Sequence, residues 1–442
     1  MNLSRIKRWI LLGHRWLGIG TCLLFFLWFL SGVVMMYVGH PKLTWQERLE
    51  HLPPLEASQP LLSPADAFRK AGIHGTVTDL RLANARAGLP VYIAQIRTDT
   101  LSAPDAPRPE PRLLALDART GALLPPTDPA TALASAQVYL EQGGLSPTSS
   151  STIRPATSPR QPSPATAQDT PGKPLYQGIT VEDAHTHSKA MDLHRPLHKV
   201  LLPDADRTLL YISGTTGEVV RDAPRLERGF NYLGAWLHWL YLFRDTAIDW
   251  TDLIIWLSVI GTVATLSGFL SGIIRWRFCR PYRSGSRSPF APGALRWHHI
   301  LGLVFALTTF TWIFSGLMSM SPYGLFPPAQ KEPDEAAYRG KAEPMADTLK
   351  QPARIIEALQ QTDFRPVGLQ WHRLGGETYV LALDGQARTR LVRAAPDGQP
   401  AVQDRWKPDD VMPAARHLFA EPATGSEVLG QYDAYYYQRH PE

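Results

Sequence analysis

The sequence predicts an α-helical membrane protein with three transmembrane helices and with α+β modules outside the bilayer. Three runs contain no charged residue: Leu17–Val38, Leu253–Ile274 and Ile300–Met320. Each run has 21 or 22 residues, and about 20 apolar residues in a helix are enough to cross the hydrocarbon core of a bilayer. The mean hydropathy of -0.17 hides these runs because the other residues are polar. The sequence therefore excludes a simple cytosolic enzyme.

Basic residues beside these runs predict which side of the membrane each end faces. Four precede the first run and six separate the second from the third, and neither segment contains an acidic residue. Because short basic segments stay on the cytoplasmic side, the N-terminus and this loop are predicted inside, and residues 39–252 and 321–442 outside. The ten basic residues are Arg5, Lys7, Arg8, Arg15, Arg275, Arg277, Arg280, Arg283, Arg287 and Arg296.

The overall charge follows from the same segregation. The chain has 45 basic and 40 acidic residues, which gives a net charge of +5. Without the ten flanking residues, 35 basic residues remain against 40 acidic ones, a net charge of -5. The basic character of the chain thus reports membrane orientation, and no nucleic-acid partner is expected.

The first run is also compatible with a cleaved signal peptide. Its charge-free length exceeds that of a signal-peptide core, and no small-x-small cleavage site precedes the polar segment at His40. We therefore expect a retained transmembrane helix that keeps the chain in the lipid bilayer.

Two segments outside the bilayer share one predicted pattern, a helix followed by three strands. In the first segment the helix begins near Ser63 and the strands lie within residues 77–116. In the second the helix begins near Gln351 and the strands lie within residues 367–393. A further hairpin is predicted at Arg207–Val220. Units of this kind are commonly scaffold with no chemistry of their own.

The predicted organisation separates these elements into eight parts. A Ser/Pro/Thr-rich stretch buries little and is predicted to be a flexible linker. In chain order the parts are the N-terminus with the first transmembrane helix (1–38), a first module (39–145), the linker (146–174), a hairpin region (175–230), an aromatic helix with the second transmembrane helix (231–275), a basic loop (276–297), the third transmembrane helix (298–320) and a second module (321–442).

One motif occurs twice in the predicted spans. The pattern H-x-x-L-G-x9-W-x2-S-G runs from His14 to Gly32 and, without a gap, from His298 to Gly316, 284 residues later. Both copies are predicted to cross from inside to outside, so they stand parallel, with the two histidines at one depth near the cytoplasmic face. His299 lies about 100° further round the helix and is the alternative to His298.

Glycines accompany each histidine at helical spacing. Gly18 and Gly302 follow their histidines by four residues, and Gly32 and Gly316 by eighteen, so all four lie near the histidine's face of the helix. A flat macrocycle against a helix needs such bare backbone, and two helices can hold one haem iron between two imidazoles. Close helix packing with an interfacial histidine is the plainer interpretation. The doubled motif favours a cofactor site.

Around these residues the chain resembles the PepSY-associated transmembrane family, which includes inner-membrane reductases for ferric siderophores. The resemblance rests on His14-Arg-Trp-Leu-Gly, Leu237-His-Trp, the pairs Ser267-Gly268 and Ser315-Gly316, and hairpins such as Thr216-Gly-Glu. It implies PepSY-like modules in the periplasm of a bacterial inner-membrane protein, and one or two haem b groups that carry electrons to a ferric siderophore or other ferric chelate. Family members often have a fourth membrane helix, and none is visible after Met320.

His238 is the predicted ligand of a second haem on the outer side. It lies in the aromatic stretch before the second span, and the family motif points to it as well. Any haem is held by axial ligands alone, because no C-x-x-C-H motif occurs. No dinucleotide fingerprint occurs either, so a quinol or a separate electron donor is expected. The candidate partners of His238 are His40 at the end of the first span, His194, His198, Met35, Met36 and Met320.

Two other functions remain open. In one, the PepSY-like modules restrain a peptidase or sense the envelope, and the spans of this non-enzymatic regulator are only anchors. In the other, the chain is a transporter subunit. Transmembrane spans without any acidic or basic residue disfavour this function. Reduction of ferric iron needs only electron delivery, so no catalytic acid, base or nucleophile is expected.

Overall fold

The computed structural model describes residues 3–73, 75–97, 111–143, 172–244, 246, 248–325, 333–341, 347–421, 425 and 427–429. It divides into two compact units. The helical unit comprises Met1–His40 and Gly229–Gln330, and the sheet unit comprises Pro41–Arg228 and Lys331–Glu442. The stretch predicted to be a linker lies outside the described residues as far as residue 171.

The helical unit contains α1 (Leu3–Tyr37), α6 (Trp250–Arg275), α7 (Ala294–Val304) and α8 (Ala306–Ser319). Among the described residues, α1 and α6 are each long and apolar enough to cross a membrane. The third predicted run is not one straight helix, because α7 and α8 meet at an angle of 66°. Phe305 between them has φ -99° and ψ 4°, which is the bridge region rather than the helical one. The pair counts as a third span only if the bent helices cross together.

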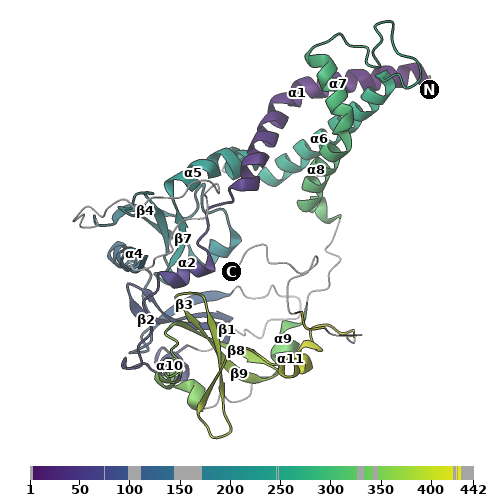
Figure 1. Ribbon diagram of the computed structural model, residues 1–442. Helices are drawn as coiled ribbons and strands as arrows, with labels where there is room; N and C mark the ends of the chain where they lie inside the picture. The colour runs from purple at the N-terminus through teal and green to yellow at the C-terminus, as the bar shows by residue number, and fades with distance from the viewer. Residues whose placement is uncertain are drawn as a thin grey trace, which may run out of the picture. The chain divides into compact units, whose positions relative to one another are not determined.

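Helices α1, α7 and α8 contact α6 (Figure 1), and glycines of α6 allow this close approach. A Cβ atom at Gly261 would lie 3.1 Å from Phe25 Cε1 on α1 and 3.3 Å from Ile313 Cγ2 on α8. At Gly272 it would lie 2.7 Å from Leu303 Cδ2 on α7. Helices in lipid associate through such small residues, because apolar side chains gain little by leaving a hydrocarbon solvent.

A short irregular helical segment leads into α6. It consists of α5 (Arg225–Asn231), the π-helical turn η2 (Tyr232–Trp236) and the 3₁₀ turn η3 (Tyr241–Phe243). Gly234 in η2 approaches α1, where an added Cβ would lie 3.2 Å from Met35 Cγ and from Val34 Cγ1. This contact places the residues that follow η2 beside α1.

The larger sheet of the sheet unit has seven strands in the order β11-β10-β9-β8-β1-β2-β3, and neighbouring strands are antiparallel. The two predicted helix-and-three-strand segments are both present. Their elements are α3 (Pro64–Lys70), β1 (Thr76–Arg86), β2 (Leu89–Arg97) and β3 (Arg112–Asp117), then α10 (Pro352–Gln360), β8 (Pro366–Leu374), β9 (Glu377–Asp384) and β10 (Thr389–Ala394), followed by β11 (Pro400–Gln403).

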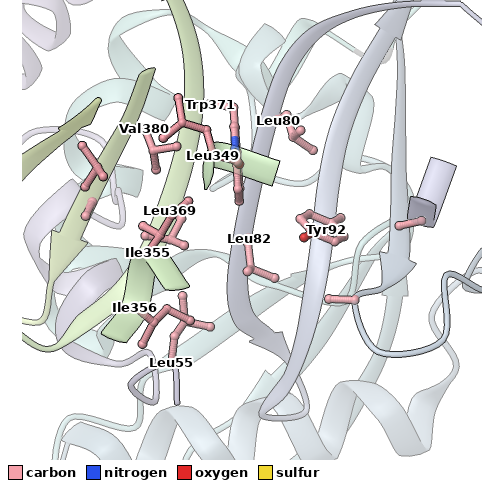
Figure 2. Packing of buried hydrophobic residues seen from close by; sticks show 14 of the residues in the cluster. Leu55, Leu80, Leu82, Tyr92, Leu349, Ile355, Ile356, Leu369, Trp371 and Val380 are labelled. Atoms are coloured by element: carbon pink, nitrogen blue, oxygen red, sulfur yellow. Dashed lines mark hydrogen bonds between the residues drawn. The ribbon is translucent and has the colours of Figure 1, made fainter. Parts of the chain in front are cut away.

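The two segments form one sheet, although the sequence predicts two separate modules. Their first strands pair antiparallel, with Leu82 of β1 opposite Leu369 of β8. Both leucines are fully buried, and Tyr92, Ile355 and Trp371 pack in the same core (Figure 2). Each segment alone would leave this face of its strands in water, so the shared core explains why they join.

A second sheet has the order β4-β5-β6-β7. Its strands are β4 (Leu175–Thr180), β5 (Leu197–Leu201), β6 (Leu209–Ser213) and β7 (Val219–Ala223), and the last two form the predicted hairpin. Helix α4 (Pro129–Gly143) covers it and buries Ala132 and Ala136 against Leu210. The remaining elements are α2 (Trp45–Glu50), η1 (Lys189–His194), η4 (Pro322–Gly324), α9 (Glu335–Arg339), η5 (Asp347–Lys350) and α11 (Pro408–Ala415).

A buried ion pair connects the two sheets. Glu218, in the turn between β6 and β7, accepts hydrogen bonds of 2.6 and 2.7 Å from Arg81 of β1. Arg48 of α2 lies 3.7 Å away, and the Thr216 hydroxyl donates at 3.1 Å. Burial alone would raise the pKa of Glu218, but the two arginines lower it to about 2. The carboxylate therefore stays ionised where it is buried.

Replacing Glu218 by Gln is expected to destabilise the sheet unit by about 3–5 kcal/mol, because the partly buried Arg48 and Arg81 lose their buried counter-charge. Chemical denaturation of the purified full-length chain measures this. The control Glu377→Gln removes one of the two carboxylate partners of Arg393, in a half-exposed pair, and should cost about 0–1 kcal/mol. Equal effects of the two substitutions would contradict the importance of the buried pair.

The same ion pair predicts a dependence of stability on pH. An unfolded glutamate titrates near about 4.3, above the folded pKa of about 2 for Glu218. The ionised carboxylate thus contributes to the free energy of unfolding at any pH above the unfolded pKa. This contribution is lost as the pH falls from the unfolded pKa towards the folded pKa. The free energy of unfolding of the Glu218→Gln variant should fall less steeply than that of the wild type in this range.

Candidate functional site

The rings of His14 and His298 lie together in the helical unit. His14 is on α1 and His298 on α7, and their ring centroids are 6.3 Å apart with an interplanar angle of 18°. A metal–imidazole bond is about 2.0 Å long, and two such bonds with the radii of the two rings span about this separation. The structure thus brings together the residues that begin the two copies of the motif.

Helix α6 fixes the orientation of His14. Its Nδ1 lies 3.2 Å from the carbonyl oxygen of Ala264. Because a carbonyl oxygen only accepts, Nδ1 carries the proton, and the lone pair of neutral His14 is on Nε2. Metal-binding histidines commonly donate one ring N–H to a carbonyl oxygen in this way and bind the metal through the other nitrogen.

Gly268 makes room for the same ring. A Cβ atom at this position would lie 2.7 Å from His14 Cε1 and 3.1 Å from Nδ1, which is too close for a real contact. Gly268 follows Ala264 by four residues, so one face of α6 supplies both the hydrogen-bond acceptor and the space. A side chain here would push the imidazole out of its place.

His299 is held by a different set of contacts. Its Nε2 lies 3.0 Å from the carbonyl oxygen of Gly272, and its Nδ1 lies 2.8 Å from Ser288 Oγ. The side chain is buried, and two aromatic rings pack edge-on against it. Nε2 donates to the carbonyl and Nδ1 accepts from the hydroxyl, so no lone pair is left for a metal. His299 therefore connects the loop between α6 and α7, through Ser288, to the carbonyl of Gly272 on α6. His298 stays the candidate ligand.

The glycines of the repeated motif have two kinds of surroundings. A Cβ atom at Gly18, Gly302 or Gly316 would meet no atom within 4 Å in the described part of the chain. Gly32 instead lies against His238, whose Cε1 would be 3.5 Å from the added Cβ. The paired imidazoles are therefore flanked by bare backbone, which leaves room for a flat group.

His238 follows η2 and is oriented by α1. Its Nδ1 lies 3.1 Å from Ser31 Oγ. The Ser31 hydroxyl donates its own proton to a carbonyl oxygen one turn earlier, at 2.6 Å from Leu27, so it accepts from Nδ1 of the imidazole. Neutral His238 therefore has its lone pair on Nε2, the same tautomer as His14.

A cavity of about 410 Å³ lies beside His238. Its walls come from α1, α6, α8 and the segment after η2, and they are mainly apolar, with several Phe and Trp rings. Ser315 and Gly316 of the second motif copy also line it. The indole nitrogen of Trp28, another lining residue, is buried without a hydrogen-bond partner among the described residues. An acceptor on a bound molecule would satisfy that donor.

The predicted partners of His238 lie in different places. His40 follows α1 and does not line the cavity. His194 and His198 belong to the sheet unit, where each bonds a hydroxyl group of that unit. Of the predicted partners, Met320 is the one that lines the cavity.

Sequence reasoning missed the groups that orient the histidines, the Ser31 hydroxyl and the Ala264 carbonyl. A signal was present, because a Ser-Gly pair occurs four times within helices α1, α6 and α8, and three of these glycines contact a histidine or accept a hydrogen bond from one. The pairs are Ser31-Gly32, Ser267-Gly268, Ser271-Gly272 and Ser315-Gly316.

These features fit a haem b group. Such a group needs nitrogen lone pairs at a fixed spacing, bare backbone and apolar walls, and it takes only axial ligands from the protein. The described residues contain no group of three or more His, Cys, Asp or Glu side chains suited to a bare metal ion. The geometry of the helical unit thus suits a ligated macrocycle at the histidine pair.

Comparison with known proteins agrees with the architecture. Neither the curated proteins nor the solved structures give a match. The family model of the PepSY-associated TM region matches residues 11–416, which include both copies of the histidine motif, His238 and both helix-and-three-strand segments. The chain is thus a membrane protein that belongs to the PepSY-associated TM region family.

Proposed function

We propose that the chain is a bacterial inner-membrane protein with three spans that passes electrons through haem b to a ferric chelate in the periplasm. The observation that carries the proposal is the pair of imidazoles of His14 and His298, 6.3 Å apart. The tautomer of His14 and the open space at Gly18 and Gly302 support it.

The proposed direction of electron flow follows from the charges beside the spans. The basic N-terminus and the basic loop are on the cytoplasmic side, so the histidine pair is the inner site. Gly32, which contacts His238, lies eighteen residues beyond His14 on α1 and therefore about 27 Å further along the helix. His238 and its cavity then form the outer site, and the sheet unit is periplasmic.

The residues of the chain hold, orient and insulate the group. Haem b, when bound, supplies a one-electron iron couple. His14 and His298 would hold it at the inner site, and Gly268 with the Ala264 carbonyl fixes the place of the His14 ring. His238 would hold a group at the outer site, where Met320 also lines the cavity.

Aromatic rings of α1 lie between the two sites. The centroids of Phe25 and Trp28 are 6.2 Å apart, and those of Trp28 and His238 are 6.5 Å apart. A quinol or a separate donor protein supplies the electrons in this proposal, since the chain shows no fingerprint for a nicotinamide or flavin cofactor. Ferric reduction requires no proton transfer by the protein, which is consistent with spans that carry no acidic residue.

Replacing either His14 or His298 by Ala is expected to lower bound haem by more than about tenfold, since loss of even an outer hydrogen bond of a ligand costs about 10- to 100-fold in affinity. Absorption spectra of the purified protein, oxidised and then reduced, measure this through the Soret and α bands. The control His417→Ala changes an exposed histidine of the sheet unit and should leave both bands unchanged.

A wild-type protein without a Soret band would refute the haem proposal. A colourless protein that tolerates all of these substitutions would instead favour the non-enzymatic regulator, in which the spans only anchor the PepSY-like modules. Wild-type haem content in both alanine variants of the pair would show that the iron is held elsewhere.

A second prediction concerns the space for the ring. Gly268→Ala should reduce haem binding by about tenfold or more, because the new methyl group displaces the His14 ring from the Ala264 carbonyl. Gly20→Ala is the matched control, since a Cβ there meets no described atom within 4 Å. An unchanged spectrum and haem content in Gly268→Ala would contradict the role of this glycine.

A further inference from the structure

A hollow of about 380 Å³ in the sheet unit is lined by four cationic side chains. Lys199 lies on β5, Arg207 on the connection to β6, and Arg225 and Arg228 on α5. The other lining residues are a glutamine and two leucines, and none of the seven is acidic. The volume lies in the range of pockets for small molecules.

Two of the four cations are already engaged. Arg228 donates to two backbone carbonyl oxygens, and Lys199 Nζ lies 3.8 Å from Asp183 Oδ2. Arg207 and Arg225 are exposed, and neither guanidinium group has an ion-pair partner in the part of the chain that the structure describes. These two side chains are available to an anion in the hollow.

Acidic residues near the hollow form no ion pair with Arg207 or Arg225 in the described part of the chain. The carboxylate of Asp204 accepts hydrogen bonds from the backbone and hydroxyl of a threonine, and the backbone carbonyl of Asp206 accepts from the backbone N–H of Arg225. Burial lowers the pKa of Arg228, Asp204 acts in the opposite direction, and Arg207 and Arg225 lower it further. Arg207 and Arg225 are thus close enough to Arg228 to repel its guanidinium group.

This concentration of positive charge is unusual for its surroundings. Outside the ten basic residues that flank the spans, the chain is net acidic, with 35 basic against 40 acidic residues. Like charges around one hollow repel, and a bound anion relieves that repulsion. Guanidinium groups also match the paired oxygen atoms of carboxylates and similar anions through bidentate hydrogen bonds.

We propose that this hollow binds a ferric chelate with several negative charges, so that the substrates are anionic carboxylate or catecholate chelates and not neutral ones. That the bound anion contains ferric iron rests on the proposed function. The preference for a polyanion rests only on the cationic side chains that line the hollow. Inorganic phosphate offers similar oxygen chemistry and is included in the test for that reason.

Binding to the purified, oxidised full-length protein without any electron donor tests the proposal. The probes are a ferric tricatecholate, which is anionic, and a ferric trihydroxamate with a neutral iron centre, each followed by equilibrium dialysis. The anionic chelate should bind at least about tenfold more tightly, and its binding should weaken with added salt. Arg207→Gln and Arg225→Gln should each weaken it by about tenfold.

The control Arg354→Gln removes an exposed arginine of α10, outside the hollow, and should leave binding unchanged. Equal affinity for the two chelates, or no effect of the substitutions at 207 and 225, would overturn the proposal. Inorganic phosphate that competes as effectively as the unlabelled chelate would overturn it too, because the hollow would then be a general anion site.

The absorption spectrum of the same samples separates this proposal from the proposed function. A colourless protein that binds the anionic chelate through Arg207 and Arg225 supports the hollow and refutes the haem. A haem-containing protein that binds both chelates equally refutes the hollow and leaves electron transfer through haem intact.

Discussion

The close approach of three helices to α6 is the constraint on which the candidate site depends. In a bilayer the helices gain little from apolar contact with each other, so their association rests on small residues and on hydrogen bonds. Gly261 admits α1 and α8, and Gly272 admits α7. Gly268 differs from these two glycines because it makes room for a single side chain, the ring of His14. Packing and placement of the imidazole thus depend on the same face of α6.

Hydrogen bonds, more than position, distinguish the histidines of the helical unit. His14 and His238 each donate Nδ1–H to an oxygen atom of a neighbouring helix, which leaves Nε2 for a metal. His299 uses both nitrogens inside the protein. Sequence spacing alone could not choose between His298 and His299, because they are neighbours on the same helix. The partners of the rings, which lie far away in the chain, make the distinction.

Much of the fold follows from local sequence, and the parts that do not are long-range. Alternating apolar residues and turn signals predicted the strands of both segments, and the gapless repeat predicted the pairing of His14 with His298. Pairing of Leu82 with Leu369 joins strands 287 residues apart, and no local pattern reports it. The bend at Phe305 also escaped prediction, since that run contains no proline. Helix α4 and strands β4 and β5 carry weaker patterns than the hairpin after them.

The distribution of charge in the proposed reductase separates electron transfer from recognition. Delivery of an electron to ferric iron needs no proton donor, and an ionised side chain within the bilayer is costly, so neutral imidazoles and aromatic rings suffice in the helical unit. Discrimination between chelates needs charge, which is cheaper to maintain beside water. The sheet unit uses charge in two ways: buried Glu218 pairs with Arg48 and Arg81, whereas Arg207 and Arg225 form no ion pair among the residues that the structure describes. Glu218 shows that the sheet unit can place a carboxylate beside its arginines. Because Arg207 and Arg225 have no such ion pair in the described part of the chain, they are suited to bind an anion from outside the protein.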